Sequence, residues 1–279
     1  MKCFYHKSDL DGQCSGAIVK YKYPNCEMFP IDYGEEFPWE QITPSETVFM
    51  VDFSLEYFKH MEALAQHNGL IWIDHHKTAI EEADKVYTLI NGKREIDKAA
   101  CELTWEYLCK DKPVPQVVYL LGRYDVWDHK DSDVLPFQMG MRIEDWDPTN
   151  NETMKRWERL FKNYWEIENR LVRGRIIVEY QTQQNKKYAE AFAFPLNFKG
   201  LRFIAANAML TNSKLFDAVW NEDEHDAMLT FGWMKYKWRV SMYTSKPGID
   251  VGQVAKEMGG GGHAGAAGFQ CDELPFDLK

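Results

Sequence analysis

The sequence predicts an α/β protein with an N-terminal doubly wound, mostly parallel sheet, linked by a long helix to a smaller mixed α/β domain. In the first half, short apolar segments alternate with helical ones, as in parallel sheets with crossover helices. In the second half, a long stretch with few helix-breaking residues precedes segments that alternate between apolar and polar residues. The 279 residues suffice for two domains, since domains commonly have about 100 to 200 residues.

Short apolar segments predict four strands in the first half, at residues 2–6, 27–31, 47–52 and 70–74. Helices are expected at 13–21, 55–67, 99–109 and 114–123. Together these elements form an expected N-terminal domain of residues 1–150.

The segment 151–188 is predicted to be one long amphipathic helix linking the domains. Its apolar residues recur at spacings of three and four, at Trp157, Leu160, Phe161, Tyr164, Ile167 and Leu171. In the second domain, residues 189–279, strands are expected at 191–198, 201–205, 227–233 and 238–244, and helices at 213–220 and 251–258.

Composition narrows the class of protein. No apolar run approaches the roughly 20 residues that a membrane span needs, so no membrane association is expected. The first residues enter a strand-like segment without a signal peptide, which favours a cytoplasmic location. The six cysteines are scattered and are interpreted as reduced thiols.

The net charge of −10 argues against binding of long duplex nucleic acid, which depends on many phosphate contacts. Three local basic clusters could still line a cleft, or could be solvated faces of helices and strands. They are Lys186-Lys187, Arg170-Arg173-Arg175 and Lys235-Lys237-Arg239.

Acidic and imidazole side chains follow the predicted strands. Asp74, His75 and His76 come directly after the apolar run 70–73, and Asp52 ends another strand. His6 ends the first strand, Asp9 and Asp11 follow it, and Asp125 lies just beyond a helix. Open α/β sheets bind ligands at the carboxyl ends of their strands, so these groups are expected to meet.

Carboxylates with a few imidazoles are a ligand set for divalent cations, and imidazole shifts the preference from Mg²⁺ toward Mn²⁺ and its neighbours. Crowded carboxylates repel one another, whereas two dications would cancel four negative charges. We therefore expect two divalent cations, Mn²⁺ first, with Mg²⁺ or Co²⁺ as alternatives.

Two other interpretations of the first motif are weaker. Asp9-Leu10-Asp11 also matches the start of a haloacid-dehalogenase phosphatase, but Gln13 stands where that family has Thr or Val. A calcium loop would need a later glycine than Gly12 and a suitably spaced Glu.

The tail contains the glycine cluster Gly259-Gly260-Gly261-Gly262-His263. Successive glycines let backbone N–H groups converge as an anion nest. A helix C-cap after Met258 would explain one or two of these glycines, but not four followed by a histidine.

These motifs and their order resemble the DHH phosphoesterase superfamily, and the glycine cluster resembles the signature of its companion DHHA1 domain. Within the superfamily, the opening His6-x-x-Asp9-Leu10-Asp11-Gly12 is most similar to the small oligoribonuclease (nano-RNase) or cyclic-nucleotide phosphodiesterase branch.

The resemblance implies roles for individual residues. His6 and Asp9 would bind one metal and Asp11, His75 and Asp125 the other, with Asp52 as the bridge. His76 would face the substrate phosphate, supported by Asp74, so that Asp52, Asp74 and His76 are the expected catalytic residues. Spacing between His6 and Asp9 varies among branches of the superfamily.

In the C-terminal domain, the resemblance assigns substrate binding to Gly261, Gly262 and His263. Arg239, Ser241 and Tyr243 share one strand face and are further candidates. Tyr243 replaces an arginine found in many DHHA1 domains, and it could either stack on a base or pack as an ordinary tyrosine.

The implied activity is two-metal hydrolysis of phosphodiester bonds in short single-stranded oligonucleotides. Cyclic (di)nucleotides and 3'-phosphoadenosine 5'-phosphate are alternative substrates, and pyrophosphate is disfavoured by the glycine cluster. A catalytically silent nucleotide sensor is the alternative of another class. The oligomeric state stays open, a homodimer included.

Overall fold

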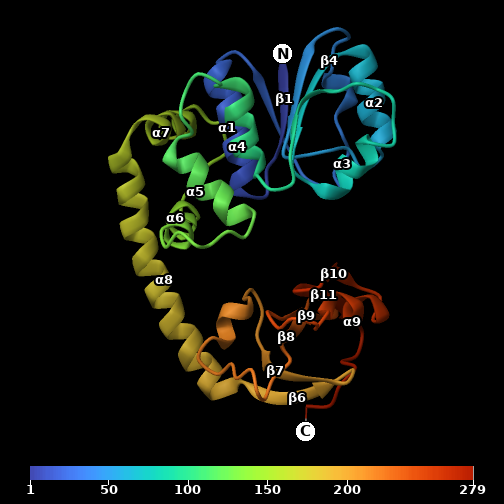
Figure 1. Cartoon of the computed structure of the whole chain (residues 1–279), viewed down its shortest axis with the longest axis vertical. Coiled ribbons are helices and arrows are strands. Elements are labelled where there is room, and N and C mark those ends of the chain that lie inside the picture. The colour runs from blue at the N-terminus through green and yellow to red at the C-terminus, as the bar shows by residue number, and fades with distance from the viewer. Residues whose placement is uncertain (279) are drawn as a thin grey trace. The chain divides into compact units, whose positions relative to one another are not determined.

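The computed structural model describes residues 1–278 and forms two compact units, Met1–Val178 and Glu179–Lys279. The predicted fold class is confirmed: an N-terminal parallel sheet is followed by a long helix and then by a mixed sheet (Figure 1).

The N-terminal sheet is parallel throughout and has five strands in the order β2-β1-β3-β4-β5. Its strands are β1 (Lys2–His6), β2 (Glu27–Ile31), β3 (Thr47–Val51), β4 (Gly69–Asp74) and β5 (Asn91–Arg94). The chain moves from β1 outward to β2 and then crosses to β3 on the other side of β1. This reversal creates a crevice beyond the carboxyl ends of β1 and β3, where doubly wound sheets bind ligands.

Helices cover both faces of this sheet (Figure 1). One face packs against α1 (Leu10–Lys22) and α4 (Ala100–Leu108), in a core that includes Ile18, Val51 and Leu103. The other face packs against α2 (Phe58–His67) and α3 (Lys77–Ala83), around the fully buried Trp72. The remaining elements of this unit are η1 (Trp39–Gln41), α5 (Gln116–Asp125), α6 (Val134–Met141) and α7 (Asn151–Lys162).

The segment 151–188, predicted as one helix, forms two helices, because the helical conformation is interrupted at Asn163. α7 ends at Lys162, and α8 runs from Tyr164 to Phe192. Asn163 has extended dihedral angles (φ −131°, ψ 114°), and its side-chain oxygen accepts the backbone N–H of Trp165 at 2.9 Å. A single asparagine therefore ends one helix and caps the next, which apolar periodicity does not reveal.

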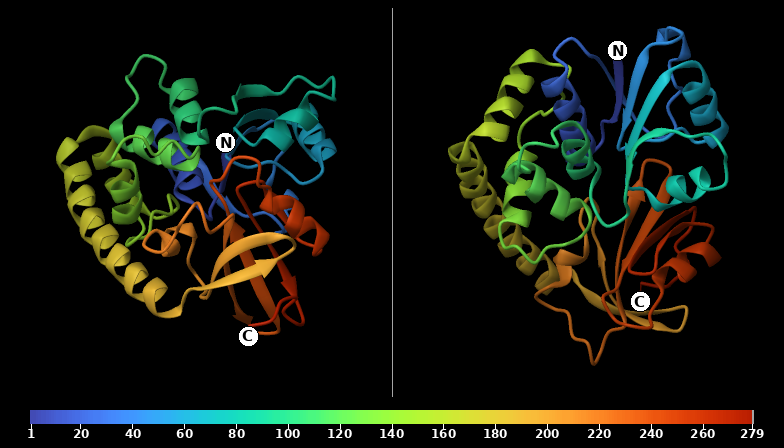
Figure 2. Two further views of the ribbon diagram at one scale, coloured as in Figure 1. Left: turned by 60° about the horizontal axis from the view of Figure 1, so that its bottom comes forward. Right: turned by 45° about the horizontal axis from the view of Figure 1, so that its top comes forward.

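The second unit contains a six-stranded sheet in the order β10-β11-β9-β8-β7-β6. All neighbours are antiparallel except β7 and β8. The strands are β6 (Phe194–Phe198), β7 (Leu201–Asn207), β8 (Ala227–Met234), β9 (Lys237–Tyr243), β10 (Gly261–His263) and β11 (Ala266–Cys271). Helix α9 (Val251–Glu257) packs against β10 and β11 (Figure 2).

The prediction of a helix at 213–220 is wrong. The segment begins as the short 3-10 helix η2 (Ser213–Phe216), capped by the Asn212 side chain. Leu215 and Phe216 are buried within this one turn, so the apolar content of the segment is used without a longer helix.

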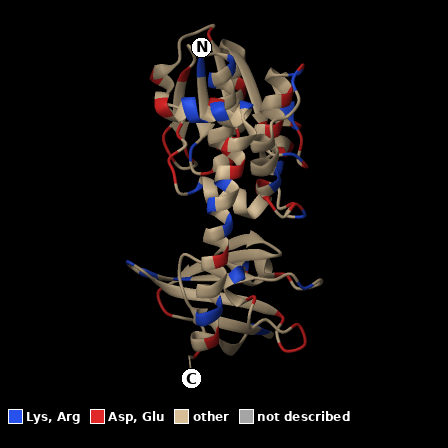
Figure 3. Ribbon diagram, turned by 90° about the vertical axis from the view of Figure 1, so that its left-hand side faces the viewer, with Lys and Arg blue, Asp and Glu red and all other residues tan. Residues whose placement is uncertain are grey.

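Acidic and basic residues are interspersed rather than separated (Figure 3). The basic cluster on α8 is engaged in ion pairs: Arg170 and Arg173 contact Glu144 at 3.1 and 2.8 Å, and Arg175 contacts Asp133 at 2.8 Å. These pairs favour a structural role for that cluster. Within residues 1–278, no helix combines the length and apolarity needed to cross a membrane.

Candidate metal centre

Three neighbouring strands deliver polar side chains to one place. His6 is the last residue of β1, Asp52 follows β3, and Asp74 is the last residue of β4. Because β1, β3 and β4 are adjacent and parallel, their carboxyl ends lie side by side. Asp52 has a left-handed backbone (φ 54°), which aspartate tolerates better than most residues.

The start of α1 supplies two further carboxylates. Asp9 caps the helix by accepting the Gly12 N–H at 2.8 Å. Asp11, in the first turn, accepts the N–H groups of Ala100 and Cys101 at 2.8 Å each, at the N-terminus of α4. These bonds orient both side chains.

Gly12 lets α1 approach the end of β1 closely. A Cβ added at Gly12 would lie 2.1 Å from the carbonyl oxygen of His6, far inside van der Waals contact. Only glycine therefore permits this placement of Asp9 and Asp11 beside His6.

His6, Asp9 and Asp52 form a first donor group, whose nitrogen and oxygen atoms lie within 4.8 Å of one another. Nδ1 of His6 is 2.7 Å from Asp9 Oδ2 and 3.4 Å from Asp52 Oδ2.

Asp11, His75 and Asp125 form a second donor group within the same 4.8 Å limit. Nε2 of His75 is 3.7 Å from Asp11 Oδ2 and 3.3 Å from Asp125 Oδ2. Asp125 is the last residue of α5, which brings it to this edge of the sheet.

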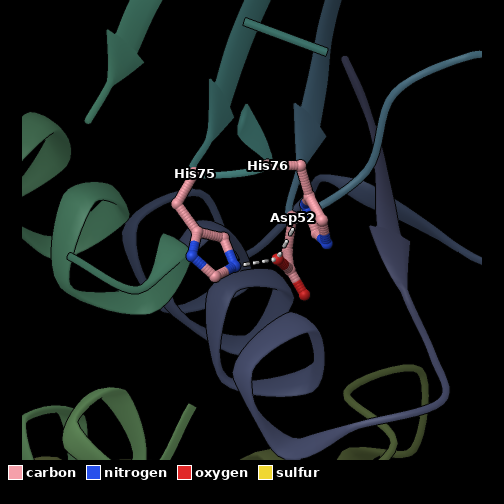
Figure 4. Close-up of side chains that lie close together, drawn as sticks. All are labelled: Asp52, His75 and His76. Carbon is pink, nitrogen blue, oxygen red and sulfur yellow. Dashed lines mark ion pairs between the residues drawn. The ribbon is translucent and has the colours of Figure 1, made fainter. Parts of the chain in front are cut away.

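Asp52 lies between the two donor groups. Its Oδ2 faces His6, whereas its Oδ1 lies 3.4 Å from His75 Nε2 and 3.9 Å from His76 Nδ1. Figure 4 shows Asp52, His75 and His76 converging in this way. The residue is 1% exposed, so one buried carboxylate presents a different oxygen to each group.

The charges in this cluster are poorly balanced without cations. Burial, reinforced by Asp52, raises the pKa of Asp11 to about 7, and burial with the charge of Asp11 raises the pKa of Asp125 to about 7. Burial also raises the pKa of Asp52. These carboxyl groups resist ionisation because they crowd together in a poorly solvated place.

The pKa values of the histidines also rise, which favours their charged form. Burial lowers the pKa of His6, but contacts with Asp52 and Asp9 outweigh it and raise the pKa to about 11. Burial also lowers the pKa of His75, but contacts with Asp52 and Asp11 outweigh it and raise that pKa to about 10. The cluster therefore attracts positive charge at both donor groups, and it gathers protons when no other cation is present.

A second observation indicates that the donor set fits divalent cations. His6 Nδ1 and Asp52 Oδ1 are buried atoms that make no hydrogen bond, although each has oppositely charged neighbours close by. Buried polar atoms are otherwise almost always paired. Mixed carboxylate and imidazole donors suit Mn²⁺, Mg²⁺ and related ions, so both donor groups could hold such an ion.

Asp74 does not join either donor group. It is fully buried, and its Oδ1 accepts the backbone N–H groups of His75 and His76 at 2.7 and 3.1 Å. The same oxygen lies 2.7 Å from His76 Nδ1, while Oδ2 accepts the indole N–H of Trp72 at 3.1 Å. Burial lowers the pKa of His76, but the bond to Asp74 outweighs it and raises that pKa.

Asp32 is a site residue that was not predicted. Its Oδ1 lies 3.2 Å from His6 Nε2, on the side of the ring opposite the donor group. Such outer carboxylates orient ligating imidazoles. Asp32 directly follows β2, so the strand-end rule that pointed to Asp52 could have found it.

The candidate substrate residues of the second unit lie in one sheet. Gly261, Gly262 and His263 form the exposed strand β10, and β11 separates it from β9. Arg239, Ser241 and Tyr243 lie on the less buried face of β9, opposite Val240 and Met242. The Tyr243 hydroxyl donates to the Thr211 carbonyl at 3.4 Å, which favours an ordinary packed tyrosine over a stacking platform.

Comparison with known families identifies two domains. Residues 3–121 match the N-terminal domain of the DHH family, and residues 197–277 match the DHHA1 domain. Between them, the two matches cover more than half of the chain.

Individual proteins are similar over most of the chain. An uncharacterized protein of Acanthamoeba polyphaga mimivirus is 25% identical over 245 residues, which are 84% of this chain and 56% of that protein. The chain thus spans about half the length of this curated relative.

Two solved structures share the fold. The pGpG-specific phosphodiesterase PggH of Vibrio cholerae has a TM-score of 0.56 at 12% identity, covering 96% of this chain and 92% of that one. An exopolyphosphatase-related protein of Bacteroides fragilis has a TM-score of 0.52 at 12% identity, covering 99% and 87%. With both domains matched and the fold shared, this chain belongs to the DHH phosphoesterase superfamily, as a member that carries a DHHA1 domain.

Proposed function

We propose that this protein is a metal-dependent phosphodiesterase that hydrolyses short single-stranded oligonucleotides or small nucleotides. The observation that carries the proposal is the position of Asp52, whose two oxygens face different donor groups. A carboxylate in that position can be shared by two cations. Two-cation sites of this kind are typical of enzymes that cleave phosphate esters.

The donor groups have separate tasks in this account. His6 and Asp9 hold one cation, Asp11, His75 and Asp125 hold the other, and Asp52 is shared. Mn²⁺ is the expected ion because imidazole contributes to both groups, with Mg²⁺ or Co²⁺ as alternatives. When bound, the cations lower the pKa of a water and neutralise negative charge on the phosphoryl group.

The remaining residues of the centre orient the histidine rings or donate hydrogen bonds to the substrate. Asp74 accepts the Nδ1–H of His76 and leaves Nε2 to donate to a phosphoryl oxygen as negative charge develops there. Asp32 fixes the other ring, since its contact with Nε2 of His6 directs Nδ1 toward Asp9 and Asp52.

Substrate recognition is assigned to the DHHA1 domain. The glycine strand Gly261–His263 offers backbone N–H groups without side-chain obstruction, and His263 is exposed. Arg239 makes no ion pair within residues 1–278 and can bind a phosphate group. Ser241 lies two residues further along the same face of β9. Short substrates are favoured because the net charge of −10 disfavours long nucleic acid.

The test is hydrolysis of a 5'-labelled RNA series, from dinucleotides to chains of about twenty-four residues, with Mn²⁺ and with chelator. We expect Mn²⁺-dependent release of mononucleotides, fastest for the shortest members, and loss of activity in Asp52→Asn. Lys85→Gln is a control. This exposed lysine lies just beyond α3, and among the described residues its one ion pair is with Glu82.

Other substrates belong in the same assay. Cleavage of cyclic or linear dinucleotides or of 3'-phosphoadenosine 5'-phosphate, with no cleavage of longer RNA, would replace the oligonucleotide substrate but keep the chemistry. Mn²⁺ binding with no hydrolysis of any of these compounds would contradict the proposal and indicate a nucleotide sensor.

A further inference from the structure

A cavity of about 260 Å³ adjoins the donor groups within the N-terminal unit. Asp9, Asp11 and Asp125 are among its lining residues, and so are Gln138 and Arg142. The two latter residues have no role in the account so far. They are four positions apart at the end of α6, so they project from one side of that helix.

Gln138 has an unused hydrogen-bonding group in this cavity. The residue is only 4% exposed, and its Oε1 is buried without a hydrogen-bond partner. No side-chain hydrogen bond of the described residues involves its amide. A buried amide without partners costs free energy. A 180° turn about its last torsion exchanges Oε1 and Nε2, so that its N–H groups can donate to the oxygens of a bound ligand.

Arg142 has an unused charge. Most arginines of this unit contact a carboxylate: Arg123 contacts Glu102, and Arg156 contacts Glu144. Arg142 has no such partner among the described ion pairs. Its guanidinium instead lies over the Tyr124 ring, 5.4 Å from the centroid, which holds it near the cavity without neutralising it.

The cavity size limits what can bind there. At about 260 Å³ the cavity is smaller than the roughly 300–1,000 Å³ typical of pockets for drug-sized ligands, and it has room for a phosphoryl group. A phosphoryl group also has oxygens for both the guanidinium and the amide.

We propose that Arg142 and Gln138 bind the phosphoryl group that is attacked at the metal centre. Arg142 donates two N–H groups to its oxygens, and the Gln138 amide, turned by 180° so that its NH2 faces the ligand, donates a third. Both residues contact the substrate directly, and Arg142 adds positive charge to a cavity that carboxylates also line. This inference rests on the proposed phosphodiesterase function and extends it to two residues outside the motifs at the strand ends.

The test combines binding with kinetics on the Mn²⁺-loaded protein. Affinity for inorganic phosphate is measured by titration calorimetry, and kcat and KM are measured on a dinucleotide. The variants are Arg142→Gln, Arg142→Lys and Gln138→Met, with Arg159→Gln as control, since Arg159 pairs with Glu166 and does not line the cavity.

We expect Arg142→Gln to weaken phosphate binding at least tenfold and to lower kcat/KM by about 100- to 1,000-fold, with unchanged Mn²⁺ content. Arg142→Lys should restore part of the loss, Gln138→Met should lower kcat/KM by about tenfold, and Arg159→Gln should change neither quantity.

Phosphate affinity within twofold of wild type in both Arg142→Gln and Gln138→Met would overturn the inference, whatever the hydrolysis results. If phosphate binding depends on Arg142 but the wild type cleaves none of the substrates, the inferred site stands and the proposed function fails.

Discussion

Nδ1 of His76 lies 2.7 Å from Oδ1 of the fully buried Asp74. An ionised carboxylate only accepts hydrogen bonds, so Nδ1 must carry the proton. The contact therefore sets the tautomer of His76 and leaves Nε2 as its outward-facing group.

Replacing Asp74 with Asn should lower kcat without removing the metals. The amide cannot accept from both His76 and the Trp72 indole, as both oxygens of Asp74 do. We expect kcat to fall by about 10- to 100-fold, with Mn²⁺ content unchanged by elemental analysis. The exposed Asp84→Asn serves as a control, and an Asp74→Asn enzyme with wild-type kcat would remove this role from Asp74.

Metal-induced stabilisation should increase with pH. Asp11 and Asp125 have folded pKa values of about 7 against 3.8, and His75 about 10 against 6.5. Raised pKa values stabilise the fold below the unfolded values, and this stability is lost as pH rises through the folded values. Chelated protein should therefore lose stability from about pH 4 to 10, whereas bound cations replace these protons.

Thermal unfolding with Mn²⁺ and with chelator across this range measures the effect. The difference in Tm between the two series should widen as pH rises. A difference that is independent of pH would mean that the cations do not displace protons from these groups.

Gly12→Ala should damage both stability and metal binding. The added methyl would meet the His6 carbonyl, which is backbone and cannot turn aside. We expect a loss of about 1–3 kcal/mol in the free energy of unfolding, together with weaker Mn²⁺ affinity. Denaturant titration and equilibrium dialysis measure these. Gly69→Ala is the matched control, because its nearest atom would lie 3.8 Å away.

Arg239→Ala should raise KM for nucleotide substrates and leave kcat and Mn²⁺ content close to wild type. The residue is exposed on β9, within the DHHA1 domain and outside both donor groups. An increase in KM of about tenfold corresponds to one lost charge-assisted hydrogen bond. Steady-state kinetics test this, with Lys199→Ala, paired to Glu257, as control. An unchanged KM would exclude Arg239 from substrate binding.

Much of the fold follows from local patterns. The strands ending at His6 and Asp74 are short apolar segments, and their bounds were predicted closely because buried parallel strands have few polar residues. β5 was not predicted, because Asn91-Gly92-Lys93-Arg94 is polar and pairs only at the edge of the sheet.

The centre could be predicted only where its residues belong to strand ends or motifs. Gln138 and Arg142 lie on a short helix with no such motif, and only the packing of α5 against α6 brings them to the cavity. Their local sequence contains no sign of this. Tertiary contacts between distant segments determine which unpaired polar groups face a ligand.

The most direct test of a shared two-cation centre is the number of Mn²⁺ ions bound per chain, measured by equilibrium dialysis with elemental analysis. Wild type should bind two, His6→Ala and His75→Ala should each lose mainly one, and Asp52→Asn should weaken both while remaining folded by circular dichroism. Full binding of two ions by Asp52→Asn, or no specific binding by the wild type, would contradict the account.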